Sequence, residues 1–383
     1  MTPTEVSTRS RPRSPYRGRP RQTFWKTAIG GRDISSLRGI YTKKFEIGPE
    51  STVVTAGSCF AQHIARYLRS AGYKVLDAER GPENLPDALV QEYGYRVYSA
   101  RYGNIYFVRQ LLQLAQEVLT EWEPADAIWS KGERWIDALR PAVEPGGLAS
   151  PEHVRRQRAD HLKAVRRVLT EADVFVFTMG LTEGWEHIAS GTVYPTAPGT
   201  IGGDFDPEIH RFHNFTVAEI VEDFRAFREL LRTINPSVRF LLTVSPVPLA
   251  ATATQHNVLT ATTLSKAVLR AAAGELEAQF ADVDYFPSYE IVTSHAPGNR
   301  PFDETGRNVR PETVEQVMAY FLAEHVPQHD VEETEPDRRS APDDTAEAEP
   351  VSRSEVAADE PYAATEERIF CEEAILEAFS DEN

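Results

Sequence analysis

A glycine, a serine and a cysteine follow one another at residues 57–59, directly after the apolar run 53–56. From Phe60 onward apolar residues recur at helical spacing, which is typical of a strand, a tight turn and a helix N-terminus. A hydroxyl or thiol at this junction would lie over unpaired backbone N–H groups and the positive end of a helix dipole, an environment that favours a nucleophile. The alternative is a buried turn with two small polar residues, because three residues alone make a weak motif.

Apolar runs and helical patterns alternate along the rest of the chain. The pattern predicts strands at 52–56, 74–76, 173–179, 238–244 and 283–286, and helices at 60–70, 106–121, 151–171, 217–232, 260–280 and 311–325. This alternation indicates a three-layer α/β/α fold with a central, mostly parallel sheet of about five strands. A Lys131-Gly132 turn predicts a surface hairpin over 128–136, and a Pro/Gly-rich excursion is expected at 194–207.

Small and polar residues follow the predicted strand ends. In parallel sheets, ligands bind outside the carboxyl ends of the strands. The segments that would meet there are Gly57-Ser58-Cys59, Gly103-Asn104, Gly180-Leu181-Thr182-Glu183, Ser245-Pro246 and the loop with His295, Asp303 and Asn308. We therefore expect a site at this edge of the sheet.

The charge distribution divides the chain into three parts. Residues 1–22 carry six Arg and one Glu and are expected to be a disordered basic arm, whereas residues 328–383 carry nineteen acids and four Arg. This acidic tail is also expected to be disordered, although its apolar residues at 369–379 have helical spacing and could form a short helix that docks on a protein partner. The middle, 23–327, has a net charge of −7 and is long enough for one large domain. Its mild acidity argues against nucleic acid as a partner.

The cysteine content and the hydropathy set further limits. The two cysteines, Cys59 and Cys371, form neither a disulfide framework nor a zinc-ligand spacing, and we expect no metal and no cofactor. The first thirty residues lack the apolar core of a signal peptide, and no apolar run approaches the 18 residues of a membrane span. A soluble, cytoplasmic protein is the expectation.

The pentapeptide Gly57-Ser58-Cys59-Phe60-Ala61 resembles the signature of the GSCFA family. Further segments that look like parts of that family are 180–185, 243–247, 265–266 and 285–290, so the resemblance covers roughly residues 40–325. The family is grouped with the SGNH/GDSL hydrolases, and the resemblance therefore implies an SGNH-like, flavodoxin-like fold.

The resemblance also implies roles for individual residues. Aligned with the Gly-Asp-Ser block of SGNH hydrolases, Gly57-Ser58-Cys59 puts Cys59 at the nucleophile position. Shifting the alignment by one residue would make Ser58 the nucleophile instead. A thiol is chemically suitable, because a helix N-terminus lowers a cysteine pKa and the thiolate is the reactive form. A buried, unreactive thiol is the alternative.

Two further blocks would supply donors for an oxyanion. Gly103, with Asn104 beside it, matches the glycine whose N–H helps to form the oxyanion hole. Within Gly180-Leu181-Thr182-Glu183, Thr182 takes the place of an asparagine donor. The alternatives are a turn glycine at 103 and a helix cap at 182.

The Asp-x-x-His block, which supplies the general base, is not intact. Asp303 is followed three residues later by Gly306, and Asn308 cannot act as a base. His295, in the same loop as Asp303, is the first candidate for a substitute base, and His256 is the second. A surface or structural role is the alternative for each.

Two functions are compatible with these residues. The first is an esterase or acyltransferase that acts on an acylated small molecule or glycan, with a glycan suggested by the superfamily and by aromatic residues near the predicted site (Tyr98, Tyr102, Trp185, Tyr289). The second is a non-catalytic binding or scaffold protein that retains the fold but lacks a complete triad.

Overall fold

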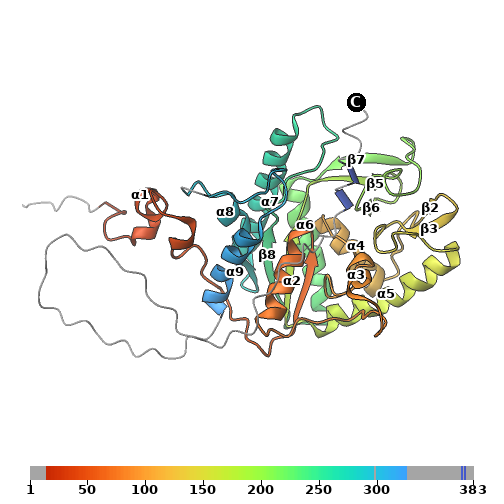
Figure 1. Ribbon diagram of the computed structural model, residues 1–383, viewed down its shortest axis with the longest axis horizontal. Coiled ribbons are helices and arrows are strands. Elements are labelled where there is room, and N and C mark those ends of the chain that lie inside the picture. The colour runs from red at the N-terminus through yellow and green to blue at the C-terminus, as the bar shows by residue number, and fades with distance from the viewer. Residues whose placement is uncertain (1–13, 297–298, 326–371, 374, 377–383) are drawn as a thin grey trace, which may run out of the picture.

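The computed structural model of the chain describes residues 14–296, 299–325, 372–373 and 375–376 (Figure 1). The predicted basic arm lies outside these residues up to position 13, and the predicted acidic tail lies outside them except at four positions. The described N-terminal part holds three short helices, η1 (Arg21–Thr23), α1 (Trp25–Ala28) and η2 (Ile34–Ser36). Within the described part of the chain, no helix has both the length and the apolar character that a membrane crossing needs.

A parallel sheet of four strands, in the order β1-β4-β8-β9, forms the centre of the fold. Its strands are β1 (Val53–Gly57), β4 (Val174–Met179), β8 (Arg239–Val244) and β9 (Val283–Tyr285). Almost every strand residue is buried, as expected for a parallel sheet covered on both faces. The predicted α/β/α architecture is thus confirmed, whereas the strand predicted at 74–76 is reduced to a single bridge between Val53 and Val75.

Alternate residues of each strand contribute to two separate cores. One face, with Val53, Val174 and Val176, packs against α2 (Phe60–Ser70), α8 (Ser288–Val292) and α9 (Pro311–His325). The other face, with Phe175 and Phe177, packs against α4 (Val108–Leu119), α5 (Pro151–Glu171), α6 (Val217–Arg232) and α7 (Val258–Gln279). Figure 1 shows α9 and α5 on opposite sides of the sheet. The short helix α3 (Asp87–Glu92) lies in the loop-rich segment that follows the Val75 bridge.

Side-chain caps fix where the long helices begin. The Ser150 side chain accepts a hydrogen bond from the backbone N–H of His153 at the start of α5, where Pro151 takes the first helical position. Thr216 and Glu219 form a capping box at the start of α6, and Asn257 caps α7. The predicted start of α5 is therefore confirmed together with its cap.

Two small antiparallel sheets lie outside the central sheet. The predicted hairpin is confirmed as β2 (Ile128–Lys131) and β3 (Arg134–Asp137). The second sheet, in the order β6-β5-β7, was not predicted and consists of β5 (Glu183–His187), β6 (Val193–Tyr194) and β7 (His210–Asn214). β5 and β7 contain histidine and charged residues, and β6 has only two residues, so the sequence shows no clear strand pattern here. At Gly184 a Cβ would lie 3.0 Å from the Phe107 ring, so a larger residue here would force the ring to shift and glycine favours the close packing of β5.

Candidate functional site

The Gly57-Ser58-Cys59 turn connects β1 to α2 at the carboxyl edge of the sheet. Gly57 has φ +137° and pairs with Thr178 of β4, whose nitrogen would lie 2.7 Å from a Cβ at position 57. Both the backbone angle and the close strand therefore demand glycine. The Ser58 N–H donates to the Thr178 carbonyl at 3.1 Å, and Cys59 directly precedes the first residue of α2. The predicted strand, turn and helix are thus all present.

The Cys59 and Ser58 side chains have different surroundings. Cys59 is 5% exposed, and its Sγ lies 3.9 Å from the hydroxyl of Tyr106. The buried Ser58 Oγ lies 3.4 Å from the position that a Cβ at Gly180 would take, and it has no hydrogen-bond partner among the residues that the structure describes. The thiol therefore lies beside a group that can exchange a proton with it, and the serine hydroxyl lies against backbone.

The Asn104 side chain is held in place by its neighbours at the turn. Its Oδ1 lies against the Tyr98 hydroxyl, which is also 3.1 Å from the Ser58 carbonyl oxygen. Gln110 fixes the backbone nearby, because its Nε2 donates to the Asn104 carbonyl and its Oε1 accepts from the Tyr106 N–H, both at 3.0 Å. With its oxygen engaged by Tyr98, the Asn104 side chain presents its NH₂ group as a donor.

A carboxylate from the distant C-terminus occupies these donors. Glu372 is completely buried, and its Oε2 accepts hydrogen bonds from the Asn104 Nδ2 and, at 3.0 Å, from the Tyr106 hydroxyl. Its Oε1 accepts from the Asn104 backbone N–H at 3.4 Å and lies 3.1 Å from where a Cβ at Gly103 would be. Burial raises the pKa of Glu372, and the hydrogen bond from Asn104 opposes that rise. Asn104 and Tyr106 therefore bind a carboxyl group through donors of which one, the Tyr106 hydroxyl, lies 3.9 Å from the Cys59 sulfur.

Lys266 of α7 is a second buried group at the site. It is 2% exposed, and its Nζ donates to the Gly180 carbonyl at 2.7 Å. Burial lowers the pKa of Lys266 to about 7, with negative charge on Glu373 and Cys59 opposing the shift and Arg307 adding to it. A lysine with this pKa is partly neutral near pH 7, so it can accept a proton as a general base.

Arg307 and Glu373 form a buried ion pair next to Lys266. The guanidinium Nη2 of Arg307 lies 3.0 Å from Oε2 of Glu373, which is 6% exposed. Burial raises the pKa of Glu373, while Arg307 and Lys266 favour its charged form. The site thus holds two carboxylates from the C-terminus and two cationic side chains from the domain.

Gly180 and its neighbours form the opposite wall of the site. Gly180 donates its N–H to the Tyr106 carbonyl at 3.1 Å, and a Cβ here would lie 2.8 Å from the Ser58 Cβ. The Thr182 N–H donates to the Ser265 hydroxyl at 3.1 Å, and the buried Thr182 Oγ1 has no partner among the described residues. Glu183 instead holds a loop, because its carboxylate accepts from the Thr252 hydroxyl at 2.9 Å.

The residues predicted to supply the general base form no hydrogen bond with Cys59 in the part of the chain that the structure describes. The Asp303 carboxylate accepts hydrogen bonds from the Thr305 N–H at 3.0 Å and the Asn308 Nδ2 at 2.9 Å, and the Thr305 side chain is the main cause of its lowered pKa. His295 and His256 are both exposed. From the loop of Asp303 it is Arg307 that reaches the site. The roles of Asp303, His295 and His256 stay predictions.

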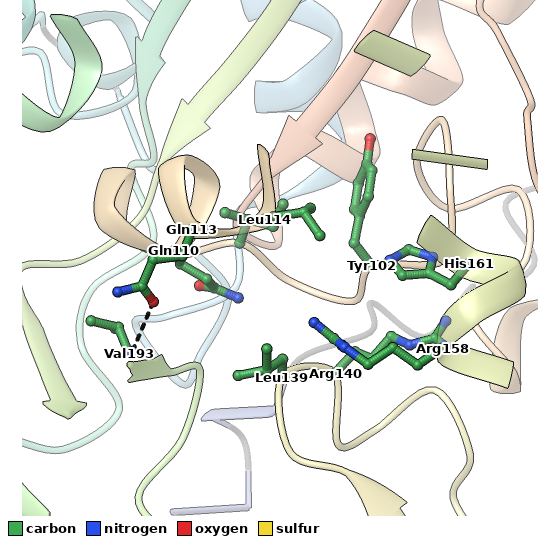
Figure 2. A pocket seen from close by; sticks show the side chains of 10 residues that line it. Tyr102, Gln110, Gln113, Leu114, Leu139, Arg140, Arg158, His161 and Val193 are labelled. Carbon is green, nitrogen blue, oxygen red and sulfur yellow. Dashed lines mark hydrogen bonds between the residues drawn. The ribbon is translucent and has the colours of Figure 1, made fainter. Parts of the chain in front are cut away.

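A buried cluster of charged residues packs against the segment that leads into Gly103-Asn104. Arg140 and Arg158 both bind Asp137, at 2.8 Å and 2.9 Å, and Arg140 also donates to the Arg101 carbonyl at 3.0 Å. Figure 2 shows these two arginines beside His161 and Tyr102 at one end of a cavity that Gln113 and Val193 close at the other. The cavity has a volume of about 20 Å³, room for roughly one water molecule, so it is part of the support and too small for a substrate.

Lys266, Tyr106 and Arg307 were not among the predicted site residues. Lys266 leaves a signal in the sequence, because it falls on the buried face of α7 that Ala261, Ser265 and Leu269 define. A lysine where the helical period requires an apolar residue indicates a buried functional charge. Arg307 lies in an exposed-looking loop and leaves no such signal.

A comparison with protein families assigns most of this domain to one family. The model of the GSCFA family matches residues 52–321, which is well over half of the chain and includes β1, the turn with Cys59, and α7 with Lys266. A comparison with curated proteins finds no match. The match over most of the domain shows that the chain belongs to the GSCFA family.

Proposed function

We propose that this protein catalyses acyl transfer, as a hydrolase or acyltransferase that acts on an ester of an acylated small molecule or glycan. One observation carries the proposal: Asn104 and Tyr106 hold the Glu372 carboxylate, and the same Tyr106 hydroxyl lies 3.9 Å from the Cys59 sulfur. Negative charge develops on the carbonyl oxygen in acyl transfer, and fixed donors that bind an anionic oxygen are suited to stabilise it. The suggested relation to SGNH hydrolases belongs to the same proposal.

In the proposed first step, Cys59 attacks the carbonyl carbon of the ester. Neutral Lys266 takes the thiol proton as the carbon–sulfur bond forms, and the carbonyl electron pair moves to the oxygen. The Asn104 N–H, the Asn104 amide and the Tyr106 hydroxyl, which now hold Glu372, would donate to this oxygen. Losing one such donor costs on the order of 3 kcal/mol in well-studied hydrolases.

In the proposed second step, the intermediate collapses and the carbon–oxygen bond of the ester breaks. The leaving alkoxide takes the proton from Lys266, so the alcohol departs neutral and an acyl thioester remains on Cys59. Water or an acceptor alcohol then attacks the thioester and gives its proton to Lys266, and the thiolate leaves and regains that proton. Lys266 thus takes the role that a histidine has in Ser-His-Asp enzymes.

An ester panel tests this function. We expect the full chain to release p-nitrophenol from p-nitrophenyl acetate and butyrate, and not from p-nitrophenyl phosphate, because the donors suit a single carbonyl oxygen. The Cys59→Ala chain supplies the background rate. Since Glu372 occupies the donors, the same panel is run on the Glu372→Ala chain. The proposal is wrong if both the unchanged chain and the Glu372→Ala chain hydrolyse both esters no faster than the Cys59→Ala chain does.

A further inference from the structure

Two consecutive acidic side chains near the C-terminus, Glu372 and Glu373, are buried in the candidate site. Together with positions 375 and 376 they form what we call the C-terminal segment, which Figure 1 shows in dark blue. The two carboxylates bind different groups: Glu372 contacts Asn104 and Tyr106, and Glu373 contacts Arg307. Residues more than 260 positions apart in sequence therefore meet at the Cys59 turn.

The contacts of Glu373 are those of an anion-binding subsite. Arg307 pairs with it at 3.0 Å, Lys266 attracts it electrostatically, and the Ala250 backbone N–H donates to it. Burying a carboxylate is costly unless charge and hydrogen bonds compensate, and here three groups from separate segments of the domain do so. Such convergence is the arrangement expected where a charged ligand is recognised.

From these contacts we infer that the site recognises an ester with a second, anionic group close to its carbonyl, and that Glu372 and Glu373 occupy the site as an internal competitor. Glu372 takes the place of the reacting carbonyl oxygen, and Glu373 takes the place of the anionic group of the substrate. The substrate assignment rests on the proposed function, whereas occupation of the site by the C-terminal segment does not depend on turnover. A ligand then gains access only when this segment leaves.

Binding of the C-terminal segment in the site can be measured through the reactivity of the Cys59 thiol. The Glu372 Oε2 binds the same Tyr106 hydroxyl that lies 3.9 Å from the Cys59 Sγ, and Cys59 itself is only 5% exposed, so release of the segment should change access to the thiol. Replacing Cys371 by serine leaves Cys59 as the only thiol of the chain. The rate at which iodoacetamide alkylates Cys59 then reports how often the site is open.

The test compares three full-length chains that all carry Cys371→Ser. Relative to the unchanged tail, Glu372→Ala with Glu373→Ala should speed alkylation of Cys59 by roughly tenfold or more, because it removes the contacts that keep the segment bound. The control pair, Glu366→Ala with Glu367→Ala, removes the same charge from the same tail and should leave the rate unchanged. Equal rates in all three chains would overturn the inference.

A second measurement tests the anion subsite. In the Glu372→Ala, Glu373→Ala chain, glutarate should slow alkylation of Cys59, whereas its uncharged diamide, glutaramide, should not. Arg307→Gln in that background should abolish the protection by glutarate. Protection by both compounds alike, or protection that survives Arg307→Gln, would refute recognition of an anion. Because alkylation needs no turnover, these outcomes are distinguishable from a failure of the ester panel.

Discussion

Replacing Cys59 by alanine should lower kcat/KM for a p-nitrophenyl ester by about 10³-fold or more, whereas Ser58→Ala should keep it within about fivefold. The difference follows from the surroundings of the two side chains. The Cys59 sulfur lies 3.9 Å from Tyr106 and interacts electrostatically with Lys266, while the Ser58 hydroxyl lies against Gly180 without a described partner. Removing the serine hydroxyl therefore leaves no acceptor or donor unpaired among the described groups.

Both variants need a stability control. The backbone hydrogen bond from Ser58 to Thr178 does not involve the side chain, so Ser58→Ala should retain the turn. Urea unfolding of the two variants should give free energies of unfolding within about 1 kcal/mol of the unchanged chain. The reverse kinetic pattern, with Ser58→Ala inactive and Cys59→Ala active, would make Ser58 the nucleophile.

Replacing Lys266 by methionine should lower kcat/KM by about 10²- to 10⁴-fold, the usual contribution of a general base. The pH dependence gives a sharper test. With a pKa of about 7, Lys266 must be neutral to accept the proton, so the rate of the unchanged chain should rise as the pH increases through about 7. The Lys266→Met chain should lose this rise, because the titrating group is gone.

The Lys266→Met variant needs a stability control. The folded state lowers the Lys266 pKa from 10.5 to about 7, so between these values the unfolded state binds the extra proton and this group makes folding less favourable as pH falls. Methionine removes that cost, but it also removes the hydrogen bond to the Gly180 carbonyl and the positive charge near Glu373, so the variant should unfold at a lower urea concentration at pH 7, and its activity is measured where it remains folded. Lys163→Met, at an exposed position of α5, is the matched control for activity. An unchanged pH profile in Lys266→Met would exclude Lys266 as the base.

The local pattern of apolar and polar residues was enough to predict the three-layer α/β/α fold and the turn at Cys59. The strands of the central sheet are mostly continuous apolar runs, which locate them in the sequence. The helices between the strands have clear apolar faces, and their period and capping residues locate them. The same logic failed for β5, β6 and β7, whose short polar strands depend on packing such as that of Gly184 against Phe107. In such strands the packing against the rest of the fold, and not the local sequence pattern, determines that a strand forms.

The candidate site could be predicted only in part. Gly103 and Asn104 were expected to hold an oxyanion, and the structure places them on a carboxylate, but their catalytic role stays a prediction. The sequence predicts the missing base among the histidines, since a histidine titrates near neutral pH without help. Lys266 reaches that range only through burial: its place on the apolar face of α7 indicates the burial, but not the lowered pKa that makes it a base. Glu372 belongs to the acidic tail, which the sequence predicts to be disordered, yet its side chain contacts the site in the domain. A contact between residues so far apart in the chain cannot be read from local sequence patterns.

The most direct test of the account is to find where the acyl group is bound during the reaction. The full chain with Cys371→Ser is mixed with p-nitrophenyl acetate, quenched in acid within seconds, and examined by peptide mass spectrometry. We expect one acetyl group on Cys59, removable by neutral hydroxylamine as a thioester is, and absent in Cys59→Ala. An acetyl group on Ser58, or ester turnover with no acetyl group on Cys59, would contradict it.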